Sequence, residues 1–85
     1  MKGIVHSINP QRGMVAIETA RHGFTIIELL LDTQIEIGDS MEWSPDTGCG
    51  SQTYINNTKG SRMQVFAQNH WVTPAQLRQQ LLFLD

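Results

Sequence analysis

The side chains that could act in catalysis are few in this sequence and lie far apart. The three histidines are His6, His22 and His70, and the single cysteine is Cys49. None has neighbours at the spacing of a metal-binding motif, and the sequence contains neither a nucleophile elbow nor a phosphate-binding glycine loop. Cys49 stands between two glycines without an adjacent base or cation to activate it. We therefore expect a protein that is not an enzyme, with no catalytic residues, no metal site and no cofactor.

Length and composition bound the fold and its environment. With 85 residues, of which 40% are apolar, the chain is expected to form one domain, because half of it would be too small to hold a core. The longest apolar runs, such as residues 81–84, are far too short to span a bilayer, and the N-terminus lacks the apolar stretch of a secretory signal. A lone cysteine cannot form an intrachain disulfide, which fits a reducing compartment. These features predict a cytoplasmic protein without a membrane segment.

The charge balance bears on possible partners. Six lysines and arginines stand against eight aspartates and glutamates, which gives a net charge of −2. Proteins that bind the phosphate backbone of nucleic acids usually carry a basic surface. The balance weakens a nucleic-acid-binding interpretation without excluding it.

The first half of the chain predicts strands. Residues 4–8 and 14–17 are rich in β-branched and apolar side chains and flank a turn, in which Pro10 presets φ and Gly13 permits an unusual backbone angle. This pattern predicts a hairpin. Residues 24–29 are again β-branched and aromatic, and predict a third strand.

The second half mixes strand and loop signals. Residues 40–43 predict a fourth strand, whereas the run of turn formers at 44–51 predicts an exposed loop without regular structure. Residues 54–57 and 63–67 flank a turn at 59–61, so one or both are expected to be strands.

The C-terminal residues change to a helical pattern. Thr73 suits an N-cap, Pro74 suits the first helical position, and residues 75–83 are good helix formers, so a helix of about ten residues is expected. Its apolar stripe consists of Leu77, Leu81 and Leu84. Several short strands without a βαβ rhythm predict a small antiparallel barrel, for which an SH3-like barrel is the competing architecture.

The first hairpin resembles that of the bacterial cold-shock domain. That family's hairpin runs Gly-x-Val-Lys-Trp-Phe-Asn, then two residues, then Lys-Gly-Phe-Gly-Phe-Ile. The residues that match it here are Met1, Gly3, Val5, Asn9, Arg12, Gly13 and Ile17. Residues 25–29 and 35–43 resemble the family's following segments, so the similarity covers residues 1 to about 58. The resemblance implies a five-stranded antiparallel oligonucleotide/oligosaccharide-binding (OB) barrel. We place this barrel at residues 1–72, and a C-terminal helix that packs on the barrel or on a partner at 73–85.

The resemblance also implies binding of single-stranded RNA or DNA, although the aromatic side chains that stack on bases are replaced here. The family's Lys-Trp-Phe matches His6-Ser7-Ile8, its Lys-Gly-Phe-Gly-Phe matches residues 12–16, and Glu28 stands where the family has a histidine. Because stacking contributes about 1–3 kcal/mol per base, three lost platforms weaken binding by roughly two to six decades. We therefore expect weak, largely non-specific and salt-sensitive binding. The residues expected to carry it are Lys2, His6, Asn9, Arg12, Met14, Phe24 and Ile26.

An apolar patch on the outer face supports an alternative function. Met14, Phe24 and Ile26 would form a surface that soluble monomers normally cover or use. The cover could be a protein partner, a second copy of the chain, or the C-terminal extension with Trp71, Leu77 and Leu81. The alternative is a protein interaction module or homodimer that uses the barrel face and the C-terminal helix without binding nucleic acid.

Both interpretations depend on the orientation of the second strand. We expect Val15 and Ile17 to fill the interior of the barrel. Arg12, Met14 and Ala16 are then expected to turn toward water.

Overall fold

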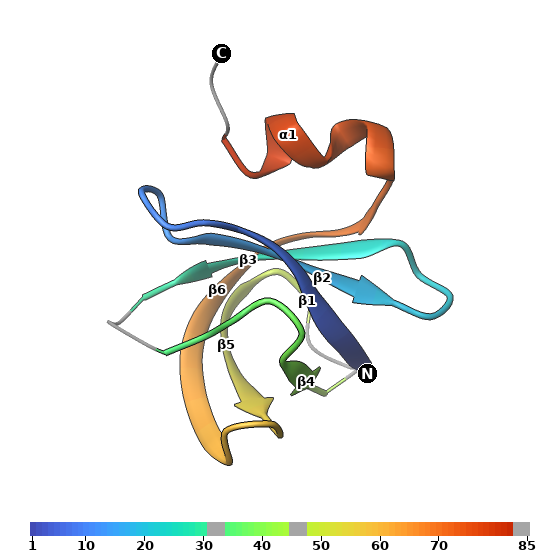
Figure 1. The fold of residues 1–85 in the computed structure, drawn as a ribbon. Coiled ribbons are helices and arrows are strands. Elements are labelled where there is room, and N and C mark those ends of the chain that lie inside the picture. Colours follow the sequence, from blue (N-terminus) through green and yellow to red (C-terminus); the bar gives the residue numbers. More distant parts are fainter. Residues whose placement is uncertain (31–33, 45–47, 83–85) are drawn as a thin grey trace.

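The computed structural model describes residues 1–30, 34–44 and 48–82, and its strands form one closed barrel (Figure 1). The six strands within these residues are β1 (Lys2–Asn9), β2 (Met14–Thr19), β3 (Phe24–Leu29), β4 (Ser40–Glu42), β5 (Gly50–Asn56) and β6 (Ser61–Val72). A short 3₁₀ turn, η1 (Pro74–Gln76), and a single helical turn, α1 (Leu77–Gln80), follow β6.

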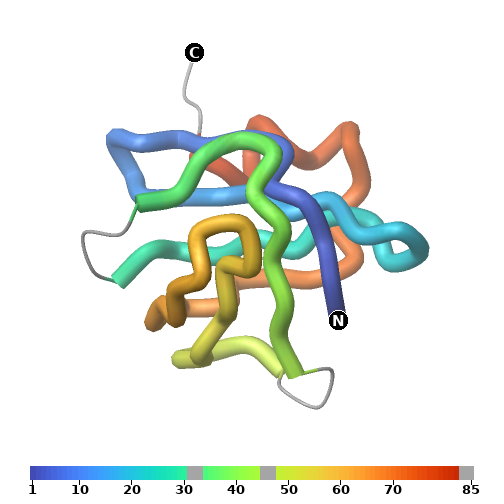
Figure 2. The backbone as a smooth tube through the Cα atoms, turned by 60° about the horizontal axis from the view of Figure 1, so that its bottom comes forward, coloured from blue at the N-terminus to red at the C-terminus, as the bar shows by residue number. Residues whose placement is uncertain are grey.

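All strand pairs of the barrel are antiparallel. β1, β2 and β3 form a meander, β6 pairs with β3, β5 pairs with β6, and β4 lies between β5 and β1. The β5–β6 turn lies on the far side of the barrel from α1 in Figure 1 and comes forward in Figure 2. The ring closes where Gly3 pairs with both Thr19 of β2 and Met41 of β4.

The expectation of an all-β antiparallel barrel followed by a short helix is confirmed, but the strand count is six rather than five. The sequence stretch assigned to a loop at 44–51 already contains the start of β5 at Gly50. β6 extends five residues beyond the predicted end at Ala67. The in–out alternation stops after Ala67, but pairing with β3 continues through Asn69 and Val72.

The C-terminal helix is much shorter than expected. Thr73 precedes Pro74 with an extended backbone, as an N-cap should, and its N–H donates to Oε1 of Gln76 at 3.1 Å. Helical geometry nevertheless ends near Leu81, and Leu82 has a left-handed φ of +61°. The last residue of the expected stripe, Leu84, lies outside the described residues.

The barrel interior is a single apolar cluster. Its fully buried members include Val15 and Ile17, so the predicted inward face of β2 is confirmed. Trp43 stacks on Tyr54 with ring centroids 4.8 Å apart and planes 4° from parallel, which fills the volume between β4 and β5.

A second apolar cluster lies outside the barrel and corrects one expectation. Met14 and Ala16 do point away from the interior, but they do not face water, because the segment after β6 covers them. The buried members of this outer cluster are Met14, Ala16, Phe24, Ile26, Val72 and Leu81, with Leu77 packed against it. Among the described residues, no helix is long and apolar enough to cross a membrane.

Candidate binding surfaces of the barrel

The outer face of β1–β3, where the sequence predicts nucleic-acid contacts, is covered by the chain itself. Period-two alternation places Met14 and Ala16 of β2 beside Ile26 of β3, and Phe24 lies next to them. All four side chains are buried, with Phe24 only 5% exposed. The covering C-terminal segment, residues 73–82, lies across this face in Figure 1. A base therefore cannot reach these side chains while the segment is in place.

Asn9 fastens the C-terminal segment to the barrel. Its side chain is buried, and its Nδ2 donates to the carbonyl oxygen of Leu81 at 2.8 Å. Asn9 itself is held by the β1–β2 turn, in which the Arg12 N–H donates to the Asn9 carbonyl at 3.2 Å. Asn9 thus binds a backbone carbonyl left unpaired at the end of α1, which is the role of a C-terminal cap.

The three remaining predicted contact residues are exposed but do not gather into one site. Arg12 lies in the β1–β2 turn, whereas Lys2 lies at the opposite end of β1, whose eight residues span about 23 Å at the usual rise per residue. His6 lies between them, and its ring packs edge-on against Phe24 at a centroid distance of 5.0 Å. The structure therefore brings Asn9, Met14, Phe24 and Ile26 together under the segment and leaves the two cations apart.

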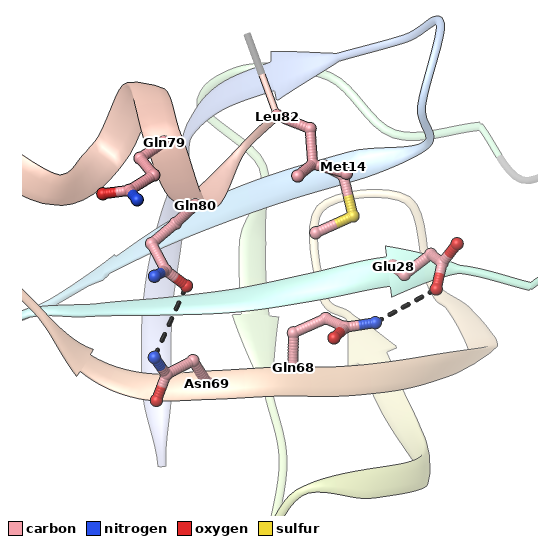
Figure 3. Close-up of a pocket in the computed structure, with 7 residues that line it drawn as sticks. All are labelled: Met14, Glu28, Gln68, Asn69, Gln79, Gln80 and Leu82. Atoms are coloured by element: carbon pink, nitrogen blue, oxygen red, sulfur yellow. Dashed lines mark hydrogen bonds between the residues drawn. The ribbon is translucent and has the colours of Figure 1, made fainter.

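A polar groove borders the covered face and was not predicted from the sequence. Figure 3 shows this amide groove, a cavity of about 270 Å³ between the C-terminal segment and strands β3 and β6. It is lined by Met14, Glu28, Gln68, Asn69, Gln79, Gln80 and Leu82. Gln68 Nε2 donates to Glu28 Oε1 at 3.1 Å, and Asn69 Nδ2 lies 3.4 Å from Gln80 Oε1. The amide groove offers donors and acceptors without a positive charge.

A row of exposed side chains on β6 was also missed. Phe66 is 38% exposed and Trp71 66% exposed, so Trp71 does not join the cover predicted for it. Alternation along β6 places Arg62, Gln64, Phe66 and Gln68 outward. This alternation is the sequence signal for the row, although the pattern predicts a strand only over residues 63–67.

One buried carboxylate has a structural role. Asp39 Oδ2 accepts hydrogen bonds from Asn56 Nδ2 at 2.8 Å and from the Glu36 N–H at 3.0 Å, and Lys59 Nζ lies 3.7 Å away. Burial opposes ionisation of Asp39, but these partners outweigh it and lower the pKa of the carboxyl below its ordinary value. The network joins the segment before β4 to the β5–β6 turn, far from the covered face.

Within the described part of the chain, no group of three or more histidine, cysteine, aspartate or glutamate side chains could hold a metal ion. Comparisons of the chain with models of known protein families, with curated proteins and with solved structures found no match.

Proposed function

We propose that this chain is a protein interaction module whose outer β1–β3 face binds an amphipathic helical segment. The observation that carries the proposal is that this face already holds such a segment, through the apolar side chains of Leu77 and Leu81 and the Asn9 clamp. A strand face that packs against Leu77 and buries Leu81, at the start and end of a helical turn, uses the apolar contacts of other helix-binding surfaces.

The charges around the face support a protein ligand over a nucleic acid. Glu28 borders the face and accepts a hydrogen bond from Gln68, so a carboxylate lies where a phosphate or base would approach. Lys2 and Arg12 lie at opposite ends of β1, and the chain carries a net charge of −2. Electrostatic attraction of a polyanion to this face is therefore weak.

We propose that the segment bound from another molecule is the C-terminal segment of a second copy of this chain, which would occupy the outer β1–β3 face. The segment leaves β6 through Thr73 and Pro74, where the backbone is extended, with φ −83° and ψ 158° at Thr73. An exchange of segments between two copies would replace each intramolecular contact by the same contact between chains, so its cost is low. The expected product is a symmetric dimer with the same Asn9 to Leu81 hydrogen bond across the chains.

Light scattering over a range of protein concentrations tests this proposal. We expect a dimer fraction that rises with concentration. In a mixture of isotopically labelled and unlabelled chains, we expect intermolecular contacts between the Leu81 methyls and Ile26. The variant Leu81→Ala should lose the dimer, and Leu82→Ala, an exposed neighbour, should keep it. A chain that stays monomeric at every concentration would rule out the exchange.

Weak binding of single-stranded nucleic acid is the second candidate, with the chain as a divergent cold-shock-like OB barrel. The strand order supports this, because a β1–β2–β3 meander is followed by a final hairpin whose last strand pairs with β3. The specific observation in its favour is the β6 row, where Phe66 and Trp71 are exposed aromatics on a strand that begins near Arg62.

Fluorescence anisotropy with labelled oligo-dT and oligo-U at low and moderate salt separates the two candidates. Nucleic-acid binding predicts a signal that weakens with salt. If the covered face is the binding face, Leu81→Ala should strengthen binding because it frees Met14, Phe24 and Ile26. If the β6 row is used instead, Phe66→Ala should weaken binding and Leu81→Ala should leave it unchanged. The absence of any signal at high protein concentration would exclude this candidate.

A further inference from the structure

A pocket at one end of the barrel shares Trp71 with the β6 row but contains no residue of the covered outer face. It lies where the β2–β3 turn, the end of β6 and the N-terminal residue meet. The β2–β3 turn and the N-terminus are on the right of the ribbon in Figure 1. This barrel-mouth pocket has a volume of about 320 Å³ and is lined by Met1, His22, Thr25, Trp43, Gly48, His70 and Trp71. Ligand sites often occupy the mouths of β-barrels, and this volume lies at the small end of their usual range of about 300–1,000 Å³.

Trp71 is held in an unfavourable backbone conformation at this pocket. Its φ is +62°, in the left-handed region that bulky side chains rarely adopt. The cause is an irregular pairing of β3 with β6. Phe24 pairs with Val72 and Ile27 pairs with Ala67, so a three-residue advance along β3 corresponds to a five-residue advance along β6. The extra residues of β6 bulge and turn the Trp71 indole out of the sheet. Because the indole is 66% exposed, its burial does not compensate for the strain.

The β2–β3 turn fixes His22 against this indole. The His22 N–H donates to Thr19 Oγ1 at 2.9 Å, and Thr19 Oγ1 donates to the Gly23 carbonyl at 2.7 Å. Gly23 has a φ of +66°, and a Cβ there would lie 2.7 Å from the Val72 carbonyl, so only glycine lets the turn approach β6 this closely. The His22 ring then meets Trp71 edge-on, with centroids 4.4 Å apart.

One polar atom at the pocket has no partner. His22 Nδ1 is buried and has no hydrogen-bond partner within the described residues. By contrast, His70 is held on both sides, with Nδ1 3.0 Å from Thr25 Oγ1 and Nε2 3.3 Å from the Gly48 carbonyl. A buried ring nitrogen without a partner is costly, and a ligand with a polar edge would supply the missing hydrogen bond.

We propose that the barrel-mouth pocket binds a planar heteroaromatic ring of nucleobase size, stacked on Trp71 with its polar edge toward His22. Trp43 and Met1 provide apolar contacts, and Trp43 is itself held in place by its stack on Tyr54. Within the described residues, no carboxylate, lysine or arginine side chain lines the pocket, and the Met1 ammonium already donates to the Trp43 carbonyl at 2.7 Å, which favours a ring without formal charge. The ring could belong to a free nucleoside or to a base of a single strand. None of the residues that line this pocket belongs to the outer cluster on the β1–β3 face, so the proposal does not depend on what binds that face.

The test is a titration of the full chain with adenosine, cytidine, ribose and oligo-dT, followed by tryptophan fluorescence and by the indole N–H resonance of Trp71. We expect saturable quenching and a shift of this resonance with the nucleosides or with the oligonucleotide, and no response to ribose. Trp71→Gly, which suits the left-handed backbone, should keep the fold by circular dichroism. It should weaken binding about 5- to 150-fold, the equivalent of one lost stacking contact.

The matched control is Phe66→Ala, which removes an exposed aromatic of the same strand outside the pocket and should leave nucleoside binding unchanged. A nucleoside response identifies a free ligand, and a response to the oligonucleotide alone that depends on Trp71 but not on Phe66 identifies a base within a strand. Either result supports the pocket. No saturable response to any ring-containing ligand would overturn the proposal, and so would binding that Trp71→Gly leaves unchanged. Neither outcome bears on segment exchange, which is measured by oligomeric state.

Discussion

Replacing Leu81 by alanine tests whether the C-terminal segment is part of the folded core. The Leu81 side chain is 1% exposed and packs in the outer cluster with Met14 and Ile26. Burial of a leucine contributes about 1.5–3 kcal/mol, and leucine-to-alanine changes in rigid cores cost about 2–5 kcal/mol. In this protein the loss of unfolding free energy is limited, because the terminal segment can detach from the barrel while the barrel stays folded. We therefore expect Leu81→Ala to lower the free energy of unfolding by about 2–3 kcal/mol.

Urea denaturation followed by tryptophan fluorescence measures this loss, with Leu82→Ala as the control. Leu82 is the next residue and is 45% exposed, so its change should stay within about 0.5 kcal/mol. Hydrogen exchange supplies a second readout, since Leu81→Ala should speed exchange after residue 72 more than in β5. Equal stability losses for the two variants would refute the claim that Leu81 anchors the segment, and the proposed function would lose its basis.

Three further changes probe other contacts. Asn9→Ala leaves the Leu81 carbonyl without its donor and should cost about 1–2 kcal/mol in urea unfolding, whereas retained stability would show that Asn9 is no clamp. Trp71→Gly relieves a left-handed backbone and should leave the unfolding free energy unchanged or raise it by up to about 1 kcal/mol; a large loss would mean that the indole holds the fold. The pKa of Asp39 is lower in the folded chain than its ordinary 3.8, so its stabilisation is present above that pH and disappears as pH falls through the folded value. Between pH 5 and pH 2, the free energy of unfolding should therefore fall more steeply for the wild type than for Asp39→Asn. Equal pH dependences of the two proteins would contradict the role assigned to Asp39.

The sequence predicted the parts of the fold that local patterns determine. Pro10 and Gly13 marked the β1–β2 turn, and alternation around Val15 and Ile17 identified the inward face correctly. The same alternation put Met14 on the outer face but left open whether a partner, a second copy or the C-terminal extension covers it, because Leu81 is far along the chain. Alternation gives a side of the sheet, whereas burial on that side depends on contacts distant in sequence.

The barrel-mouth pocket could not be predicted for a different reason. It requires two extra residues in β6 opposite β3, and a bulge changes the facing of side chains in a way that period-two patterns do not encode. His22 and Trp71 are 49 positions apart and meet only because Gly23 allows the close approach. The helix was overestimated because good helix formers in 75–83 do not specify where a short terminal helix ends.

Closure of the strand ring at Gly3 has a consequence for the behaviour of the chain at high concentration. A methyl group at this position would lie 2.7 Å from the Glu18 carbonyl and 2.5 Å from Ile17 Cγ2, so any larger residue would push β1 away from β2. Where the β1–β2 pairing is lost, both strands become edge strands whose free amide and carbonyl groups can pair with other chains, as in fibril formation. The missing side chain of one glycine thus protects the protein against edge-to-edge aggregation.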